Sequence, residues 1–168
     1  MKFFLIGLPG SGKTTIGKLL AEKLKLPFID LDVEIEKSES QSVTEIFASK
    51  KEVYFRELES RLLKDFSTSS ESFVMSTGGG APSSHNNMKI MNETGITIFL
   101  DVPASEIARR LEMTNLTERP LFNKLSNEQL KDKIEFLRSQ RISFYKQAKF
   151  SFEGTSVSVD EIISRITK

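Results

Sequence analysis

The chain has 168 residues, a length that fits one domain spanning 1–168, and 38% of its residues are apolar and 28% charged. With 13 phenylalanines and a mean hydropathy of -0.25, it has the composition of a globular protein that closes its own core. Lys and Arg number 24 against 23 Asp and Glu, so the net charge is +1, which disfavours a dedicated nucleic-acid binder.

The absence of cysteine excludes a disulfide framework, a thiolate metal site and a cysteine nucleophile. The single histidine, His85, cannot build a histidine-based zinc site alone. No apolar run approaches the roughly 18 residues of a membrane span. The N-terminal apolar run breaks at Gly7 and Pro9. We therefore expect a cytoplasmic protein without a signal peptide.

Five short segments have the length and composition of β-strands, and four of them are apolar almost throughout. Such continuous apolar runs are typical of parallel strands that helices cover on both faces. The five segments are Phe3–Ile6, Pro27–Leu31, Phe73–Ser76, Ile96–Leu100 and Phe150–Phe152.

The segments between these strands show signals of helices. Two of them carry apolar faces at helical spacing, formed by Ile16, Leu19, Leu20 and Leu24 and by Phe55, Leu58, Leu62 and Phe66. Three have a capping box at their start, formed by Ser42 with Glu45, Ser126 with Gln129, and Ser158 with Glu161. Pro103 is predicted to begin a helix, Pro103–Glu112.

The alternation of strands and helices predicts an α/β fold of three layers. Right-handed crossovers give a doubly wound, five-stranded parallel sheet with helices on both faces. Ligands of such sheets bind beyond the carboxyl ends of the strands.

A phosphate-binding loop follows the first predicted strand. The segment 7–14, GLPGSGKT, matches G-x-x-x-x-G-K-[ST] in full. Its glycines allow backbone N–H groups to turn toward phosphate oxygens, Lys13 reaches the β- and γ-phosphates, and the Thr14 hydroxyl can bind Mg²⁺. The helix predicted from Thr14 adds its positive N-terminal dipole. The motif predicts a fold of the P-loop NTPase type.

Two carboxylates close the second predicted strand, in the sequence Asp30-Leu31-Asp32. Alternation along a strand would send both to the same side. One of them could hold the water shell of a metal ion, and the other could accept the proton of a hydroxyl group. The alternative is that they cap the next helix, for which Asp32 is well suited.

Three glycines, Gly78, Gly79 and Gly80, follow the third predicted strand. Glycines at such a place indicate that another group approaches the backbone closely. The alternative is a flexible turn into the polar stretch Pro82–Asn87. This stretch and His85 are assigned no role.

Two arginines stand next to apolar helix faces. Arg141 falls on the apolar stripe of its helix, where an unpaired guanidinium should not be buried. That stripe consists of Leu130, Ile134, Leu137, Phe144 and Ala148. Arg56 lies at the start of the Phe55–Phe66 helix, beside its apolar face. Together the two arginines suit an anionic substrate, because a guanidinium binds a carboxylate through two hydrogen bonds. The alternative is that their stems cover the core while their heads lie in water.

The polar segment 113–125 contains Arg119-Pro120-Leu121. A basic segment near a phosphate site favours a mobile lid that excludes water and brings Arg119 to the transferring phosphoryl group. The alternative for Arg119 is a loop residue that faces solvent.

In this order, these motifs resemble the shikimate kinase family, small P-loop kinases of the nucleoside-monophosphate-kinase type. The resemblance covers most of the chain. It rests on GLPGSGKTTIGK at 7–18, FIDLD at 28–32, EIF at 45–47, FRELE at 55–59, TGGGA at 77–81, RPL at 119–121 and R-x-x-x-Y at 141–145.

The resemblance implies transfer of the γ-phosphate of MgATP to the 3-hydroxyl of shikimate, giving shikimate 3-phosphate and ADP in chorismate (aromatic amino acid) biosynthesis. It implies a monomer, and the charge and apolar runs described above predict that this monomer is cytoplasmic and binds neither nucleic acid nor membrane. One Mg²⁺ per subunit would be held by Thr14 and, through water, by Asp30. The shikimate-binding region would lie at about 32–62 and the lid at about 113–125.

The resemblance also implies roles for particular residues, with Asp32 as the base that orients and deprotonates the 3-hydroxyl. The catalytic residues would be Asp32, Lys13 and Arg119. The ATP-binding residues would be Gly10, Ser11, Gly12, Lys13, Thr14, Thr15 and Arg119. The shikimate-binding residues would be Asp32, Arg56, Gly78, Gly79, Gly80 and Arg141. Neither Arg110 nor the segment 153–155 is assigned a contact with adenine.

Two other functions are compatible with a phosphate loop. One is a kinase for another small polyol acid such as gluconate, against which the three glycines and the paired aspartates argue. The other is a catalytically silent nucleotide-binding module that regulates a partner. Loss of Asp32 or Arg119 would favour the module, and both residues are present.

Overall fold

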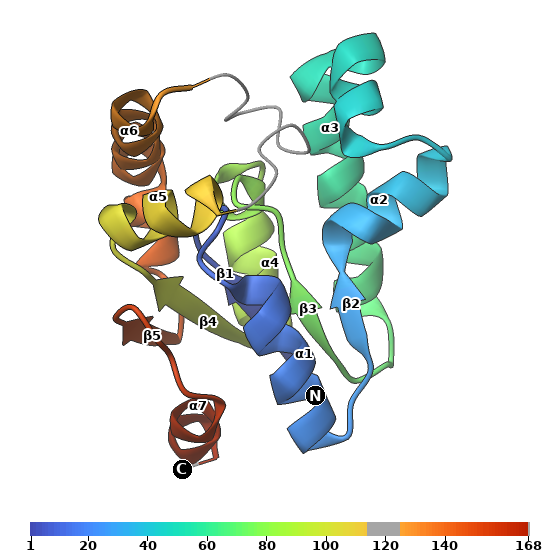
Figure 1. The fold of residues 1–168 in the computed structure, drawn as a ribbon. Coiled ribbons are helices and arrows are strands. Elements are labelled where there is room, and N and C mark those ends of the chain that lie inside the picture. Colours follow the sequence, from blue (N-terminus) through green and yellow to red (C-terminus); the bar gives the residue numbers. More distant parts are fainter. Residues whose placement is uncertain (114–124, 168) are drawn as a thin grey trace.

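The computed structural model describes residues 1–113 and 125–167. Five parallel strands form one sheet in the order β2-β3-β1-β4-β5 (Figure 1). They are β1 (Lys2–Ile6), β2 (Phe28–Asp30), β3 (Phe73–Ser76), β4 (Ile96–Asp101) and β5 (Phe150–Glu153). All five predicted strands are confirmed, and because every pairing is parallel, the carboxyl ends meet at one edge.

Helices connect the strands and cover both faces of the sheet. They are α1 (Lys13–Leu24), α2 (Leu31–Glu39), α3 (Val43–Thr68), α4 (Asn87–Thr94), α5 (Ala104–Glu112), α6 (Asn127–Tyr145) and α7 (Val159–Ile166), with a 3₁₀ turn at Ala81–Ser83. Neighbouring side chains of β1 point to opposite faces. Phe4 lies in a core formed with α2 to α6, whereas Leu5 lies in a second core formed with α1 and α7. The predicted three-layer α/β fold is confirmed.

The predicted helix starts are confirmed at three of four places, Ser42, Ser126 and Ser158, and two of the three predicted capping boxes are formed. The capping boxes at Ser42 and Ser126 are present. The one predicted at Ser158 is wrong, because its side chain makes no capping hydrogen bond although it precedes α7. The prediction at Pro103 is one residue early, since Pro103 has extended backbone and the helix begins at Ala104.

Two predicted apolar faces are rotated slightly in the structure. Leu19 is 46% exposed, because α1 turns Leu20 and the neighbouring small residues toward the sheet. On α6, Phe144 is only half-buried, and the fully buried Tyr145 occupies the place expected for it. Arg141 is buried on the same face, as its position in the stripe predicted.

Helix α3 consists of two helical segments that meet at Lys51. The sequence predicted them as separate helices, one starting at Ser42 and one around Phe55–Phe66. At Lys51 the backbone has φ 67° and ψ 172°, a conformation that is essentially restricted to glycine. The second segment carries Arg56.

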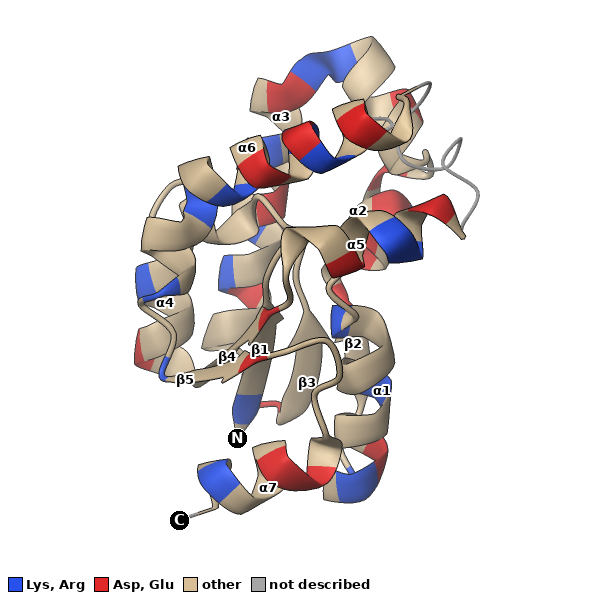
Figure 2. Ribbon diagram, turned by 60° about the vertical axis from the view of Figure 1, so that its left-hand side comes forward, with Lys and Arg blue, Asp and Glu red and all other residues tan. Residues whose placement is uncertain are grey.

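Charged residues of both signs alternate along the outer helices, as Figure 2 shows for α3, α6 and α7. This mixture agrees with the net charge of +1. Among the helices of residues 1–113 and 125–167, none is both long and apolar enough to cross a membrane.

Candidate active site

The phosphate loop lies between the end of β1 and the start of α1, as its motif predicted. Gly10 and Gly12 have φ of 82° and 94°, a left-handed conformation that favours glycine. Helix α1 begins at Lys13, one residue before the predicted start. The Lys13 side chain is buried, and its Nζ donates hydrogen bonds to the carbonyls of Gly7 (3.0 Å) and Leu8 (2.8 Å). The ammonium group is thereby held over the loop.

Ser11, inside the same loop, has a buried hydroxyl with no hydrogen-bond partner among the described residues. Buried polar groups nearly always have a partner in native proteins. A phosphate oxygen in the loop would provide one.

Asp30 connects the phosphate loop to α2. Its Oδ2 accepts a hydrogen bond from Thr14 Oγ1 at 3.1 Å, and its Oδ1 accepts one from the backbone N–H of Asp32 at 3.1 Å. Thr14 Oγ1 also lies 3.5 Å from Ser76 Oγ at the end of β3. Asp30 therefore caps α2 while facing the hydroxyl that the motif assigns to a metal ion.

Asp30 and Asp32 lie close together for a different reason from the strand alternation that the sequence predicted. The strand ends at Asp30, and Asp32 lies in the first turn of α2, so alternation along a strand does not place them together. The helix start does so instead. The cap is provided by Asp30 rather than Asp32, which leaves Asp32 Oδ1 buried without a partner in the described part of the chain.

The electrostatics of Asp32 suit proton transfer. Burial, reinforced by the charge of Asp30, raises its pKa to about 6, while Lys13 and Arg56 act in the opposite direction. A general base works best when its pKa lies near the operating pH.

The three glycines after β3 are packed closely by surrounding side chains, as the sequence indicated. A Cβ on Gly78 would lie 2.7 Å from Oε1 of Glu59 and 3.2 Å from Oδ1 of Asp32. A Cβ on Gly80 would lie 2.6 Å from Cζ of Arg56. Only glycine allows these charged groups to approach the loop so closely.

The middle glycine joins the two halves of the site. A Cβ on Gly79 would lie 2.7 Å from Cδ of Pro9 in the phosphate loop and 3.2 Å from Nη1 of Arg141. That nitrogen is buried and has no hydrogen-bond partner among residues 1–113 and 125–167. A guanidinium nitrogen in this condition is suited to bind an anion.

Glu59 is a site residue to which the sequence reasoning gave no role. It is fully buried, and its Oε2 accepts a hydrogen bond from Nη1 of Arg56 at 2.9 Å. Burial raises its pKa to about 7 despite the opposing effect of Arg56. The sequence contains a signal for this ion pair, since a glutamate three residues after Arg56 falls on the same helix face.

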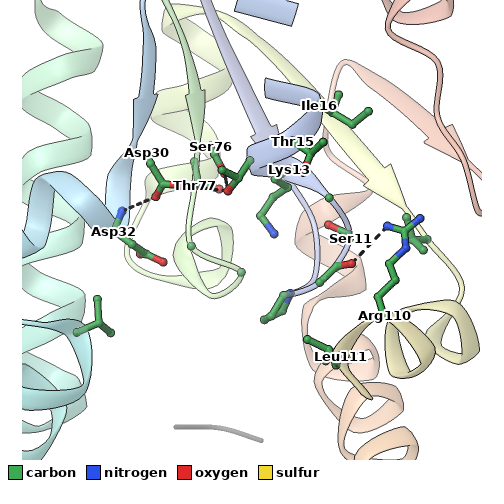
Figure 3. A pocket seen from close by; sticks show the side chains of 18 of the residues that line it. Ser11, Lys13, Thr15, Ile16, Asp30, Asp32, Ser76, Thr77, Arg110 and Leu111 are labelled. Atoms are coloured by element: carbon green, nitrogen blue, oxygen red, sulfur yellow. Dashed lines mark hydrogen bonds between the residues drawn. The ribbon is translucent and has the colours of Figure 1, made fainter. Parts of the chain in front are cut away.

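Two neighbouring cavities contain the site. The larger, of about 1010 Å³, is lined by the phosphate loop, Asp30, Asp32, Ser76, Gly78 and Gly79, and Figure 3 shows Lys13 facing the two aspartates across it. The smaller, of about 510 Å³, is lined by Arg56 and Arg141 among others. Both arginines pack against the glycine loop, which lines the larger cavity through Gly78 and Gly79.

Arg110 closes the other end of the larger cavity (Figure 3). Its guanidinium is held by Glu106 at 2.8 Å and donates to the carbonyls of Gly10 (3.4 Å) and Thr155. The contact with Thr155 uses a backbone carbonyl, which the residue type does not reveal. Arg119 and the lid segment 114–124 lie outside the described residues.

No cluster of three or more His, Asp or Glu residues able to hold a metal ion occurs in the described ranges. A metal ion here would therefore take most of its ligands from phosphate and water. Mg²⁺ suits such a site, because it keeps several waters and is commonly bound by one or two protein oxygens together with phosphate oxygens.

The parallel sheet, the phosphate loop at its carboxyl edge and the facing carboxylate of Asp32 define a P-loop kinase. The family model for shikimate kinase matches residues 9–168. A shikimate kinase from Persephonella marina is 43% identical over 167 residues, which cover 97% of both chains.

Solved structures agree with this family. The crystal structure of shikimate kinase from Bacteroides thetaiotaomicron superposes with a TM-score of 0.90 at 37% identity, covering 99% of this chain and 96% of the other. A shikimate kinase from Acinetobacter baumannii, described as a complex with shikimate, superposes with a TM-score of 0.86 at 29% identity, covering 99% and 90%.

The chain belongs to the shikimate kinase family. It is a kinase that phosphorylates shikimate with ATP, which confirms the predicted activity. Gluconate as the substrate and a silent regulatory module are both set aside by this membership.

Proposed function

We propose that the larger cavity holds the phosphates of ATP against the glycine loop, and that shikimate lies between Asp32 and the two arginines. The observation that carries this arrangement is the convergence of Asp32 Oδ1 and Arg141 Nη1 on Gly78 and Gly79, where both atoms are buried without a partner among the described residues. The likeness to the Acinetobacter baumannii enzyme in complex with shikimate supports it.

On the donor side, we assign phosphate binding to the backbone of Gly10–Gly12, to Ser11 and to Lys13, with Thr14 and Thr15 in the first turn of α1. Lys13 already lies over the loop, held by two carbonyls. Its ammonium would meet the charge that develops on the transferring phosphoryl oxygens.

One Mg²⁺ fits beside Thr14 and Asp30. The Thr14 hydroxyl would bind the ion directly, and the Asp30 carboxylate, 3.1 Å from that hydroxyl, would hold one of its waters. When bound, the ion neutralises charge on the phosphate oxygens.

On the acceptor side, Asp32 would orient the 3-hydroxyl of shikimate and accept its proton. The raised pKa makes the carboxylate a strong enough base near neutral pH. Positioning and electrostatic stabilisation would then supply most of the rate of in-line phosphoryl transfer.

Arg56 and Arg141 would bind the carboxylate of shikimate, and the amides of the glycine loop would donate to the same substrate. Arg56 is oriented for this by Glu59, which fixes one guanidinium nitrogen at 2.9 Å. Two guanidinium groups on a carboxylate give geometric specificity as well as charge.

We further propose a single domain with a lid at about 113–125, whose Arg119 meets the transferring phosphoryl group. We propose a monomer that acts in the cytoplasm and binds neither nucleic acid nor membrane. Its large exposed apolar side chains among the described residues are scattered over different helices, including Leu19 on α1, Val53 on α3 and Phe136 on α6.

A coupled assay that measures ADP release from MgATP tests the roles assigned to Asp32 and Arg141. The assay is run with shikimate, with gluconate and without an acceptor. Asp32→Asn should lower shikimate-dependent kcat at least about 100-fold and leave the Kd of ATP unchanged. Asp65→Asn, the same change at an exposed position of α3, is the control. Full turnover by Asp32→Asn would remove Asp32 from the role of base.

Arg141→Ala, measured in the same assay, should raise the KM for shikimate at least about 10-fold with little change for ATP. Equal weakening of both substrates would instead assign Arg141 a purely structural role.

A further inference from the structure

The buried face of α6 ends in a tyrosine for which the proposed reaction has no use. Tyr145 is completely buried, and its ring packs against Phe99 of β4 with centroids 5.0 Å apart. Its hydroxyl donates a hydrogen bond of 2.6 Å to the carbonyl of Gly79. Burial raises the pKa of Tyr145 to about 12, so the hydroxyl keeps its proton and remains a donor.

This hydrogen bond fixes the middle of the glycine loop. In the described part of the chain, the amides of Gly78, Gly79 and Gly80 make no hydrogen bond. Because the peptide unit is planar, holding the Gly79 carbonyl also sets the direction of the Gly80 N–H. The carbonyls of Gly78 and Gly80 accept hydrogen bonds from the turn that follows, from Ala81, Ser83 and Ser84. The Tyr145 hydroxyl adds an anchor from another element at the centre of three glycines, whose backbone entropy is otherwise large.

Tyr145 also lies on the same stripe of α6 as Arg141. Arg138, Arg141 and Tyr145 are spaced i, i+3 and i+7, which places them on one helix face. Arg138 forms an ion pair of 2.9 Å with Asp101 at the end of β4. Helix α6 is thus fixed to the sheet edge on one side of Arg141 and to the glycine loop on the other.

We propose that Tyr145 is a positioning residue for the acceptor: its hydroxyl holds the Gly79 carbonyl so that the loop amides and the Arg141 guanidinium keep the spacing that shikimate requires. This inference rests on the acceptor site of the proposed function. The competing explanation is that the hydroxyl merely satisfies a buried polar group, as buried tyrosines usually require.

Tyr145→Phe separates the two explanations, because it removes one oxygen and keeps the ring. If Tyr145 positions the acceptor, the KM and Kd for shikimate should rise about 5- to 10-fold, while the KM for ATP stays within about twofold, a size that matches the net value of one hydrogen bond. The control is Ser164→Ala on α7, which removes a hydroxyl that donates to the carbonyl of Glu161 at 2.9 Å and belongs to neither substrate site. It should leave both KM values unchanged.

Equal changes for both substrates, or a lower melting temperature with no change in the KM for shikimate, would overturn the proposal. Arg141→Ala, assayed beside it, distinguishes the failures. If that variant weakens shikimate and Tyr145→Phe does not, the proposed acceptor site stands and the role of Tyr145 is wrong. If neither variant weakens shikimate, the acceptor site itself is wrong.

A double variant adds a readout that a structural role would not give. In the Arg141→Ala background, the additional loss caused by Tyr145→Phe should shrink below about threefold, because one of the two groups that it positions is gone. Full additivity would show that Tyr145 does not act through Arg141.

Discussion

Gly80 leaves the space that the guanidinium of Arg56 occupies. A Cβ on Gly80 would lie 2.6 Å from Cζ and 2.7 Å from Nη1 of Arg56. The backbone of Gly80 has φ -88°, which alanine adopts without strain. An added methyl group would therefore displace the end of a flexible side chain and leave the fold intact.

Gly80→Ala should act on substrate binding more than on stability. We expect the KM for shikimate to rise about 10-fold, the KM for ATP to stay within twofold, and the free energy of unfolding to fall by less than about 1 kcal/mol. Steady-state kinetics and denaturant unfolding measure these values. An unchanged KM for shikimate would show that Arg56 need not hold its present position.

Gly79→Ala is the matched comparison. Its Cβ would lie 2.7 Å from the ring of Pro9, a rigid part of the phosphate loop. Relief of this contact must move backbone, so this variant should weaken ATP as well as shikimate. A selective effect on shikimate alone would contradict the close packing of the two loops.

Asp32 should make both activity and stability depend on pH, in opposite directions. Its pKa is about 6 in the folded chain, against 3.8 ordinarily. With Asp32 as the base, kcat/KM for shikimate should rise with pH through about 6. Between about pH 4 and 6 the folded state binds this proton more tightly than the unfolded state, so the stability contributed by the neutral acid is lost as the pH rises.

Asp32→Asn, which mimics the neutral acid, should therefore be more stable than the parent chain at pH 8, by about 3 kcal/mol. At pH 4 the two chains should unfold alike. Thermal unfolding of both chains at pH 4 and at pH 8 measures the difference in their stability. An equal difference at the two pH values would show that it does not come from the ionisation of Asp32.

The fold was predictable from this sequence because strands and helices alternate and because the strands are apolar almost throughout. The phosphate loop was equally accessible, since its chemistry is local and its glycines, Lys13 and Thr14 are consecutive. The glycine loop was recognisable as a place of close approach. The groups that pack against it, Glu59 and Pro9, come from other elements, so only the folded chain identifies them.

The other differences between the predicted and the observed site also arise from contacts between elements. Asp32 lies in a helix because Asp30 caps that helix, and the sequence alone does not decide which of the two aspartates, separated by one residue, is the cap. Tyr145 carries no charge, and a buried aromatic residue on a helix face predicts core packing alone. Arg110 binds backbone carbonyls, which no residue type reveals.

Thr14 offers a direct test of the metal site. Thr14→Val keeps the shape of the side chain and removes the hydroxyl that faces Asp30 at 3.1 Å. We expect the Mg²⁺ concentration that gives half-maximal activity to rise at least about 10-fold, because one of the few protein oxygens for the ion is lost. Thr14→Ser, which keeps the hydroxyl, should stay near the parent value. The same Mg²⁺ dependence in the valine variant would place the ion elsewhere.

Lys51 joins the two segments of α3 in a backbone conformation, φ 67° and ψ 172°, that costs a non-glycine residue about 1–3 kcal/mol. Lys51→Gly should remove most of this strain. The greater freedom of glycine in the unfolded chain offsets up to about 1 kcal/mol, so we expect a net gain of about 1 kcal/mol and a melting temperature about 2–4 °C higher. Lys51→Ala is the control, because it removes the same side chain and keeps the strain. Equal stabilisation by both variants would attribute the gain to the lysine side chain and would contradict a strained junction in α3.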